Sequence, residues 1–307
     1  MTQYRQKKIA MINDLSGYGR CSLTVALPIL SAMRMQCCPV PTSILSNHTG
    51  FPVYFFDDYT EKMEAYLEKW KELNLDFDGI ATGFLGSGEQ IHIVSSMIKS
   101  FRGEETRVIV DPIMGDHGKP YATYTPDMCR EMEKLVRLAD VVTPNVTEAC
   151  ILTGRAYKGE GWSRNELKKM ALEIQKMGPG AVVITGVSSR EKARMGAAPA
   201  GAAAELSTEE NGPVYLTNVL LEPDGKLTFQ KSAKTGGERP GTGDVFSSII
   251  AGAAVQGWDM KAAVRLAARF VKECIQKSDE LKVPVEDGVC FEELLPELVL
   301  ACRRMGK

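Results

Sequence analysis

Two glycines and an acidic residue stand together in the segment Arg239-Pro-Gly-Thr-Gly-Asp244. A helix is expected to begin at about Thr242, and the first N–H groups of a helix bind anions because they have no partner within the helix. Gly241 and Gly243 let the backbone approach a phosphate without a Cβ clash. Asp244 either complements the helix dipole or takes a proton from an attacking hydroxyl. The segment predicts a phosphoryl-transfer site with Asp244 as its base.

Acidic residues follow two of the predicted strands. The segment Asp111-Pro-Ile-Met-Gly-Asp116 follows one strand, and Thr143-Pro-Asn145 with Glu148 follows the next. Ligands of α/β proteins bind at the carboxyl ends of strands, and two carboxylates near a polyphosphate suit hydrated Mg²⁺. Thr143 and Asn145 can face a phosphate, and Glu148 can face a metal ion or its waters. An ordinary Asp-Pro turn and a helix cap are the alternative interpretations of these segments.

A fourth polar block, Ser46-Asn-His-Thr-Gly50, ends another apolar run and precedes an aromatic-rich stretch that includes Phe51 and residues 54–56. A single histidine such as His48 is more often structural than a ligand. Five small polar groups beside aromatic side chains nevertheless indicate a flap on the substrate side of the site.

Other catalytic motifs are missing from the sequence. It contains no G-x-x-x-x-G-K-[ST] segment, so it is not a P-loop enzyme, and it lacks the V-A-I-K and H-R-D segments of protein kinases. The segment Gly17-Tyr-Gly-Arg-Cys-Ser lacks the third glycine of a dinucleotide-binding loop. Eight cysteines without a C-x-x-C pair or a histidine at ligand spacing favour structural thiols over zinc.

Composition and charge set further bounds on the function. Lys and Arg number 37 against 39 Asp and Glu, a net charge of −2 that offers no bulk attraction for nucleic acid or an anionic membrane. The basic N-terminus is followed by too short an apolar patch for a secretory signal, and no apolar run is long enough to span a bilayer. We therefore expect a cytoplasmic protein that acts on a small molecule.

Short apolar runs alternate with amphipathic stretches along the chain. Strands are predicted at 8–12, 37–45, 78–82, 107–110, 140–143 and 181–185, with a hairpin at 214–221 and 226–230. Three- and four-residue spacing of apolar side chains predicts helices at 20–33, 58–73, 90–101, 126–138, 146–153, 164–177, 242–256, 260–277 and 292–303. This alternation indicates a three-layer α/β fold with a mostly parallel central sheet and helices on both faces.

One segment departs from this pattern. Residues 187–213 include an Ala/Gly-rich tract with little to bury, and we expect a mobile loop there. No linker divides the chain into two cores, so one domain is expected over residues 1–307.

Together these motifs resemble those of the ribokinase superfamily and, within it, the pyridoxal/pyridoxamine kinase family, over about residues 7–300. The Gly241–Asp244 segment is similar to the anion hole and catalytic base of the superfamily. The block from Ser46 to Gly50 is the most specific to pyridoxal kinases. The resemblance implies a ribokinase-like fold, a homodimer, and transfer of the ATP γ-phosphoryl group to the 5′-hydroxyl of a vitamin B6 vitamer in the salvage of pyridoxal phosphate.

The resemblance also implies roles for individual residues. The backbone N–H groups of Gly241, Thr242 and Gly243 would stabilise the transferred phosphoryl group. Mg²⁺, with K⁺ as a possible monovalent companion, would be supported by acidic side chains. The implied sets are Asp111, Asp116 and Glu148 for metal, Thr143, Asn145 and Thr185 for nucleotide, and Asn13, Asp14, Ser46, His48, Thr49 and Phe84 for substrate.

The sequence departs from most pyridoxal kinases in its first loop and its aromatic wall. Ile12-Asn13-Asp14 replaces a Gln-Ser-His and leans towards hydroxymethylpyrimidine kinases, so Asn13 or Asp14 would supply the contact to the ring nitrogen. Phe84 stands where a tyrosine is common, which keeps ring stacking without the hydroxyl. A hydroxymethylpyrimidine (phosphate) kinase of thiamine synthesis is the alternative function, and a non-catalytic vitamer-binding protein is a third.

Overall fold

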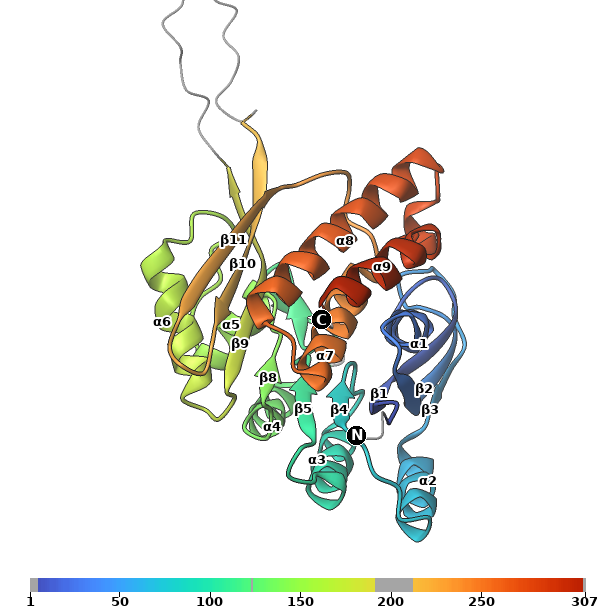
Figure 1. Cartoon of the computed structure of the whole chain (residues 1–307). Coiled ribbons are helices and arrows are strands. Elements are labelled where there is room, and N and C mark those ends of the chain that lie inside the picture. The colour runs from blue at the N-terminus through green and yellow to red at the C-terminus, as the bar shows by residue number, and fades with distance from the viewer. Residues whose placement is uncertain (1–4, 123, 191–211, 306–307) are drawn as a thin grey trace, which may run out of the picture.

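A single long sheet organises the molecule (Figure 1). The computed structural model describes residues 5–122, 124–190 and 212–305. The strands of this sheet lie in the spatial order β11-β10-β9-β8-β5-β4-β1-β2-β3. Their bounds are β1 Lys8–Tyr18, β2 Gln36–Asn47, β3 Phe56–Asp58, β4 Gly79–Thr82, β5 Arg107–Val110, β8 Val141–Val142, β9 Ala181–Arg190, β10 Val214–Leu221 and β11 Leu227–Ala233. The short strands β6 (Gly115–Asp116) and β7 (Lys119–Pro120) form a separate hairpin.

The centre of the sheet is parallel and its margins are antiparallel. Strands β2, β1, β4, β5, β8 and β9 pair in parallel, whereas β3 and the β10–β11 hairpin run antiparallel to their neighbours. The strand order reverses between β1 and β4, because the chain first crosses outward from β1 to β2 and then returns to β4. Such a reversal opens a crevice at the carboxyl ends of the strands, which is where α/β proteins bind ligands.

Helices cover both faces of the sheet, as Figure 1 shows. One buried cluster joins the sheet to α2 (Thr60–Glu72), α3 (Gly88–Phe101), α4 (Pro126–Val136), α5 (Val146–Thr153) and α6 (Arg164–Gln175). The other cluster joins it to α1 (Ser22–Ala32), α7 (Thr242–Gln256), α8 (Met260–Glu280) and α9 (Leu295–Met305).

Strand β1 shows why its apolar run is continuous. Ile9 and Met11 pack into the cluster of α1 and α7, whereas Ala10 and Ile12 pack into the cluster of α2 to α6. Successive side chains of a strand point to opposite faces, so a strand covered on both sides must be apolar at every position. The predicted three-layer α/β fold is thereby confirmed.

Several boundaries differ from the expectation. Strand β1 runs six residues beyond Ile12, and β9 runs past Thr185 to Arg190, so residues 187–190 of the expected loop are strand. They pair with β10, which the sequence pattern of β9 alone did not indicate. Residues 191–211 of that loop lie outside the described residues. Strand β3 and the β6–β7 hairpin were not expected, because strands of two or three residues carry no periodic signal.

No helix within the described ranges is long and apolar enough to cross a bilayer.

Candidate functional site

The N-terminus of α7 presents backbone N–H groups that can hold an anion. Gly241 precedes the helix with φ +82°, and a Cβ there would lie 2.1 Å from the carbonyl oxygen of Arg20, so only glycine fits. At Gly243 a Cβ would meet nothing within 4 Å, which leaves space in front of the helix end. The free N–H groups and the dipole of a 15-residue helix favour a phosphate at this point.

A buried arginine holds the loop that leads into this helix. Arg239 is 8% exposed. Its guanidinium donates to the carbonyl oxygens of Val283 and Pro284 at 3.0 and 3.1 Å and to the Asp279 carboxylate at 2.9 Å. The Thr242 hydroxyl donates to the Arg239 carbonyl oxygen at 3.1 Å. These contacts fix the loop against the segment that follows α8.

Asp244 lies in the first turn of α7, beside the middle of β1, where the pairing of β1 with β4 ends. The Asn13 amide nitrogen is 3.5 Å from its Oδ1. Burial raises the pKa of Asp244 to about 6, and the negative charge of Asp14 adds to the rise, whereas hydrogen bonds from the Ser22 backbone and Asn13 oppose it. A carboxylate with a pKa just below neutrality is ionised at pH 7 and yet basic enough to accept a proton from a hydroxyl.

Asp14 is tied to the start of α1. Its carboxylate accepts from the Ser16 hydroxyl at 2.9 Å and from the Ser22 hydroxyl at 2.5 Å, and it is 7% exposed. Burial raises its pKa despite these hydrogen bonds. Asp14 therefore has a structural role at the site, and its predicted contact with a substrate ring stays a prediction.

Asp111 and Thr143 follow β5 and β8 at the same edge of the sheet. Burial raises the pKa of Asp111 to about 7 and the charge of Asp244 adds to the rise, whereas the nearby hydroxyls of Ser247 and Thr143 lower it. The Thr143 Oγ1 atom is buried and makes no hydrogen bond of normal geometry within the described residues. It lies close enough to Asp111 to act on that carboxylate.

Glu148 caps the N-terminus of α5, which was one of the two roles expected for it. Its two carboxylate oxygens accept from the backbone N–H groups of Met114 at 3.1 Å and Asn145 at 2.7 Å, and the Asn145 side chain caps the helix in return. The Asn145 amide also donates to the Gly115 carbonyl oxygen at 2.9 Å. Burial, and next the charge of Asp111, raise the pKa of Glu148 well above its ordinary value.

The predicted metal residues are spread over this edge. Asp116 is exposed, and its Oδ1 accepts from the His117 N–H at 2.7 Å. Within the described ranges no three His, Cys, Asp or Glu side chains converge on one metal position. Carboxylate oxygens that are spread out in this way suit a hydrated Mg²⁺ that takes most of its ligands from water and phosphates, so the residues fit such an ion rather than an all-protein cage.

The polar block at the end of β2 is pinned to other parts of the chain. His48 accepts from the Gly50 N–H through Nδ1 at 3.1 Å, and its Nε2 lies 2.7 Å from the Glu286 carbonyl oxygen. The Ser46 hydroxyl accepts from the Phe55 N–H at 2.8 Å, and Thr49 is exposed. Both nitrogens of His48 are engaged, so its contact with a substrate stays a prediction, as do those of Ser46 and Thr49.

Phe84 lies two residues after the end of β4 and contacts Asn13 of the neighbouring strand β1. Its N–H donates to the Asn13 Oδ1 at 2.8 Å, and its carbonyl oxygen accepts from the Thr42 hydroxyl at 3.0 Å. Thr185 on β9 lies farther along the sheet, with its N–H on the Pro144 carbonyl oxygen at 2.9 Å. The chain fold thus brings Asn13, Asp14, Asp111, Thr143 and the α7 N-terminus to one edge, with Thr185 at its far end.

Four residues of this site were not predicted from sequence. Ser22, Ser247 and Arg239 support Asp14, Asp111 and the α7 loop, as described above. Tyr121 lies among the carboxylates: burial and then the charges of Glu148, Asp116, Asp111 and Asp244 raise its pKa. The position of Ser247 one turn after Asp244 could have indicated it, and Arg239 adjoins the glycine loop. Ser22 and Tyr121 carry no comparable signal.

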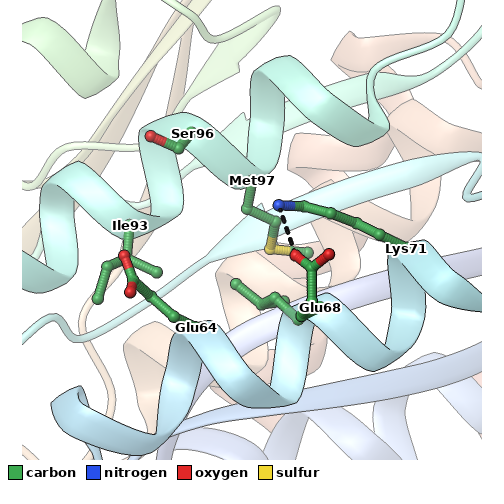
Figure 2. Close-up of a pocket in the computed structure, with 7 residues that line it drawn as sticks. Glu64, Glu68, Lys71, Ile93, Ser96 and Met97 are labelled. Atoms are coloured by element: carbon green, nitrogen blue, oxygen red, sulfur yellow. Dashed lines mark hydrogen bonds and ion pairs between the residues drawn. The ribbon is translucent and has the colours of Figure 1, made fainter.

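A surface pocket lies away from these residues. It has a volume of about 260 Å³ and lies between α2 and α3, with the lining residues drawn in Figure 2: Glu64, Leu67, Glu68, Lys71, Ile93, Ser96 and Met97. Lys71 pairs with Glu68 at 3.3 Å. None of the predicted site residues lines it.

The chain matches known kinases over most of its length. Residues 29–287 match the phosphomethylpyrimidine kinase family. The chain is 25% identical over 286 residues to the pyridoxal kinase PdxY of Rubrobacter xylanophilus, with 91% of this chain and 90% of that protein covered. It is 26% identical over 272 residues to the hydroxymethylpyrimidine/phosphomethylpyrimidine kinase of Rhizobium meliloti, with 86% and 89% covered.

A solved structure is closer in sequence. It is a Bacteroides thetaiotaomicron protein, provisionally named a phosphomethylpyrimidine kinase and crystallised with pyridoxal. This chain is 35% identical to it. The match covers 96% of both chains, and the two structures superpose with a TM-score of 0.84. The resemblance predicted from the motifs is confirmed: the chain belongs to the phosphomethylpyrimidine kinase family of ribokinase-like proteins, in which its relatives include pyridoxal kinases.

Proposed function

We propose that the protein transfers the γ-phosphoryl group of ATP to the 5′-hydroxyl of a vitamin B6 vitamer, namely pyridoxal, pyridoxamine or pyridoxine. The observation that carries the proposal is the position of Asp244, in the first turn of α7 beside an open glycine end, with a pKa of about 6. The pyridoxal bound by the 35% identical relative supports a vitamer as the acceptor.

In the proposed reaction Asp244 takes the proton of the 5′-hydroxyl as its oxygen attacks the γ-phosphorus. The bond from that phosphorus to the bridging oxygen breaks, and ADP leaves. The N–H groups of Gly241, Thr242, Gly243 and Asp244 would hold the equatorial oxygens of the transferred group. They act in the partly buried end of a helix whose dipole already favours negative charge.

The nucleotide and its cation would lie along the carboxyl ends of β5, β8 and β9. Thr143, with a buried hydroxyl beside the Asp111 carboxylate, Asn145 and Thr185 would contact phosphates. Asp111 and Asp116 would hold Mg²⁺ through water, and Glu148, both of whose oxygens are engaged, would act on it electrostatically. The ion would neutralise charge that develops between the β- and γ-phosphates.

Phe84 would stack on the vitamer ring, with Ser46, His48 and Thr49 on the opposite side and Asn13 and Asp14 below. The alternative is a hydroxymethylpyrimidine kinase, which the family profile and the first loop favour. Both acceptors are flat, substituted heteroaromatic rings with a hydroxymethyl group, so the phosphate machinery would serve either.

ADP release from Mg-ATP with pyridoxal, pyridoxamine, pyridoxine and hydroxymethylpyrimidine, at matched concentrations, separates the two. We expect turnover of at least one B6 vitamer above that of the pyrimidine. Turnover of the pyrimidine alone would replace the proposal by its alternative. Tight pyridoxal binding with no ATP consumption would indicate a non-catalytic binding protein.

We also propose a cytoplasmic homodimer. An apolar surface at the β2–β3 edge supports self-association, since Val53, Tyr54, Phe55 and Phe56 are 44–78% exposed. Sedimentation velocity at micromolar protein concentration tests this proposal, and a monomer under those conditions would refute it.

A further inference from the structure

Asn13 occupies the point where the crevice opens. Strand β1 pairs with both β2 and β4 up to Ile12, and from Asn13 onward it pairs with β2 alone. The register with β2 shifts between Asn13 and Leu15, so a bulge redirects the side chains there. Asn13 is 1% exposed and therefore needs partners for its amide.

The orientation of the Asn13 amide is fixed by backbone donors. Its Oδ1 accepts from the N–H of Phe84 at 2.8 Å and from the N–H of Asp14 at 3.0 Å. An oxygen that accepts two N–H groups cannot exchange places with the NH₂ group. The Nδ2 atom must therefore face the other way, where it lies 3.5 Å from the Asp244 Oδ1.

Gly83 makes room for this arrangement. A Cβ at residue 83 would lie 2.3 Å from the Asn13 Nδ2 and 2.4 Å from its Cγ. The Gly83 N–H also donates to the Ile12 carbonyl oxygen at 2.7 Å, which keeps the two backbones together. The place where β4 ends beside β1 is thus packed around the Asn13 side chain.

The Asp244 carboxylate lies among other acidic groups, so its ionised form needs hydrogen-bond donors. Asp14 on β1 raises the pKa of Asp244, and Asp244 in turn raises the pKa of Asp111 at the end of β5. Tyr121 and Cys21 are also within electrostatic reach of Asp244. The backbone of Ser22 on α1 and the Asn13 amide donate to Asp244. Asn13 supplies a neutral side-chain donor to Asp244, from the end of its amide opposite the one that holds the Phe84 N–H.

We propose that Asn13 is a positioning residue for Asp244, which couples the orientation of the base to the Phe84 wall of the acceptor pocket. This inference rests on the proposed function for its consequence in catalysis. Its role differs from the predicted ring contact of Asn13, because the Oδ1 that could accept a hydrogen bond from a protonated ring nitrogen already accepts from two N–H groups.

Two substitutions distinguish positioning from a merely structural role. Asn13→Asp keeps an Oδ1 acceptor for Phe84 and Asp14 but turns an oxygen instead of NH₂ towards Asp244, whereas Asn13→Ala removes both contacts. We expect Asn13→Asp to lower kcat at least about thirtyfold, with the KM for ATP unchanged within about twofold. Asn13→Ala should lower kcat and also raise the KM for the vitamer, because Phe84 loses its anchor.

A matched control separates the expected loss of kcat from the destabilisation that any newly introduced carboxylate causes. Gln175 on α6 donates through its amide nitrogen to the carbonyl oxygens of Gly180 and Glu222 at 2.9 and 3.1 Å, and it belongs to no part of the site. Gln175→Glu makes the same exchange of NH₂ for oxygen and should lower the melting temperature with kcat unchanged. If Asn13→Asp keeps kcat within about threefold of the wild type, the positioning role is overturned.

A second measurement does not depend on the acceptor. The Asp244 carboxyl carbon can be followed by NMR titration in protein labelled at aspartate, with Asp244→Asn as the assignment control. We expect its pKa to rise in Asn13→Ala, since a donor to the ionised form is lost. An unchanged titration would refute the contact, whether or not any vitamer is turned over; silence of the wild type on all four acceptors would refute only the proposed function.

Discussion

Replacing Asp244 by asparagine should abolish catalysis and make the protein more stable. The pKa of Asp244 rises from 3.8 to about 6 on folding, chiefly because the carboxylate is buried. Folding therefore disfavours its ionised form. Each pKa unit corresponds to about 1.4 kcal/mol, so the ionised Asp244 lowers the free energy of unfolding by about 2–3 kcal/mol once its partial exposure is allowed for.

The sign of the effect depends on pH. Below about pH 3 the carboxyl is protonated in both the folded and the unfolded chain and contributes no penalty. The penalty grows between about pH 3 and pH 6, as the unfolded chain loses its proton first, and it is complete above pH 6. Asparagine stays neutral throughout, so the gain in stability should be full at pH 7, small at pH 4 and absent near pH 3.

Urea unfolding at pH 7 and pH 4 measures this difference. Asp78→Asn is the matched control, because Asp78 is also buried but shows the opposite shift. Burial raises its pKa, yet the hydrogen bonds from the Lys8 N–H at 2.8 Å and from Lys7 at 2.9 Å outweigh burial and leave the pKa below its ordinary value. Asp78→Asn should therefore destabilise the protein at pH 7. An Asp244→Asn variant no more stable than the wild type at pH 7 would refute the reasoning.

Four further substitutions test other parts of the site. Gly243→Ala should fold normally, since its Cβ meets nothing, but lower kcat at least about tenfold by obstructing the phosphoryl group, whereas Gly241→Ala should reduce soluble yield and melting temperature. Arg239→Ala should destabilise the protein by about 1–2 kcal/mol in urea unfolding, because it leaves partly buried carbonyl oxygens without their donor; a loss under about 0.5 kcal/mol would contradict its anchoring role. Phe84→Leu should raise the KM for the vitamer several-fold at an unchanged KM for ATP, measured by initial rates, and an equal rise in both would exclude stacking.

The sequence was sufficient to predict the layers and most of the elements. Long periodic stretches such as α7 and continuous apolar runs such as β5 carry strong local signals, and both have the predicted bounds. The glycines of the α7 end could be found because their requirement is local: a positive φ at Gly241 and open space at Gly243. Acidic residues at strand ends were likewise predictable once a parallel sheet was inferred.

The detailed partners within the site could not be predicted, because they come from distant parts of the chain. Asn13 and Asp244 are 231 residues apart, and the contact exists only because β1 and α7 meet at the reversal of strand order. His48 likewise meets Glu286, 238 residues away. Residue types predicted that both would be polar contacts, but whether each faces a ligand or another part of the chain depends on side-chain orientation, which no spacing rule encodes.

The placement of the acidic side chains explains why the site needs so many backbone donors. Asp14, Asp111, Glu148 and Asp244 all have pKa values raised first by burial, and mutual repulsion adds to the effect for Asp111, Glu148 and Asp244. Burying several carboxylates at one sheet edge disfavours folding, and the N–H groups of Met114, Asn145 and Ser22 offset part of that penalty. Asp14 and Glu148 are held by the chain itself, whereas a site built only for stability would replace Asp111 and Asp244 by neutral side chains. The presence of these two carboxylates at the edge where α7 presents its N-terminus is therefore itself an argument that they act on a ligand.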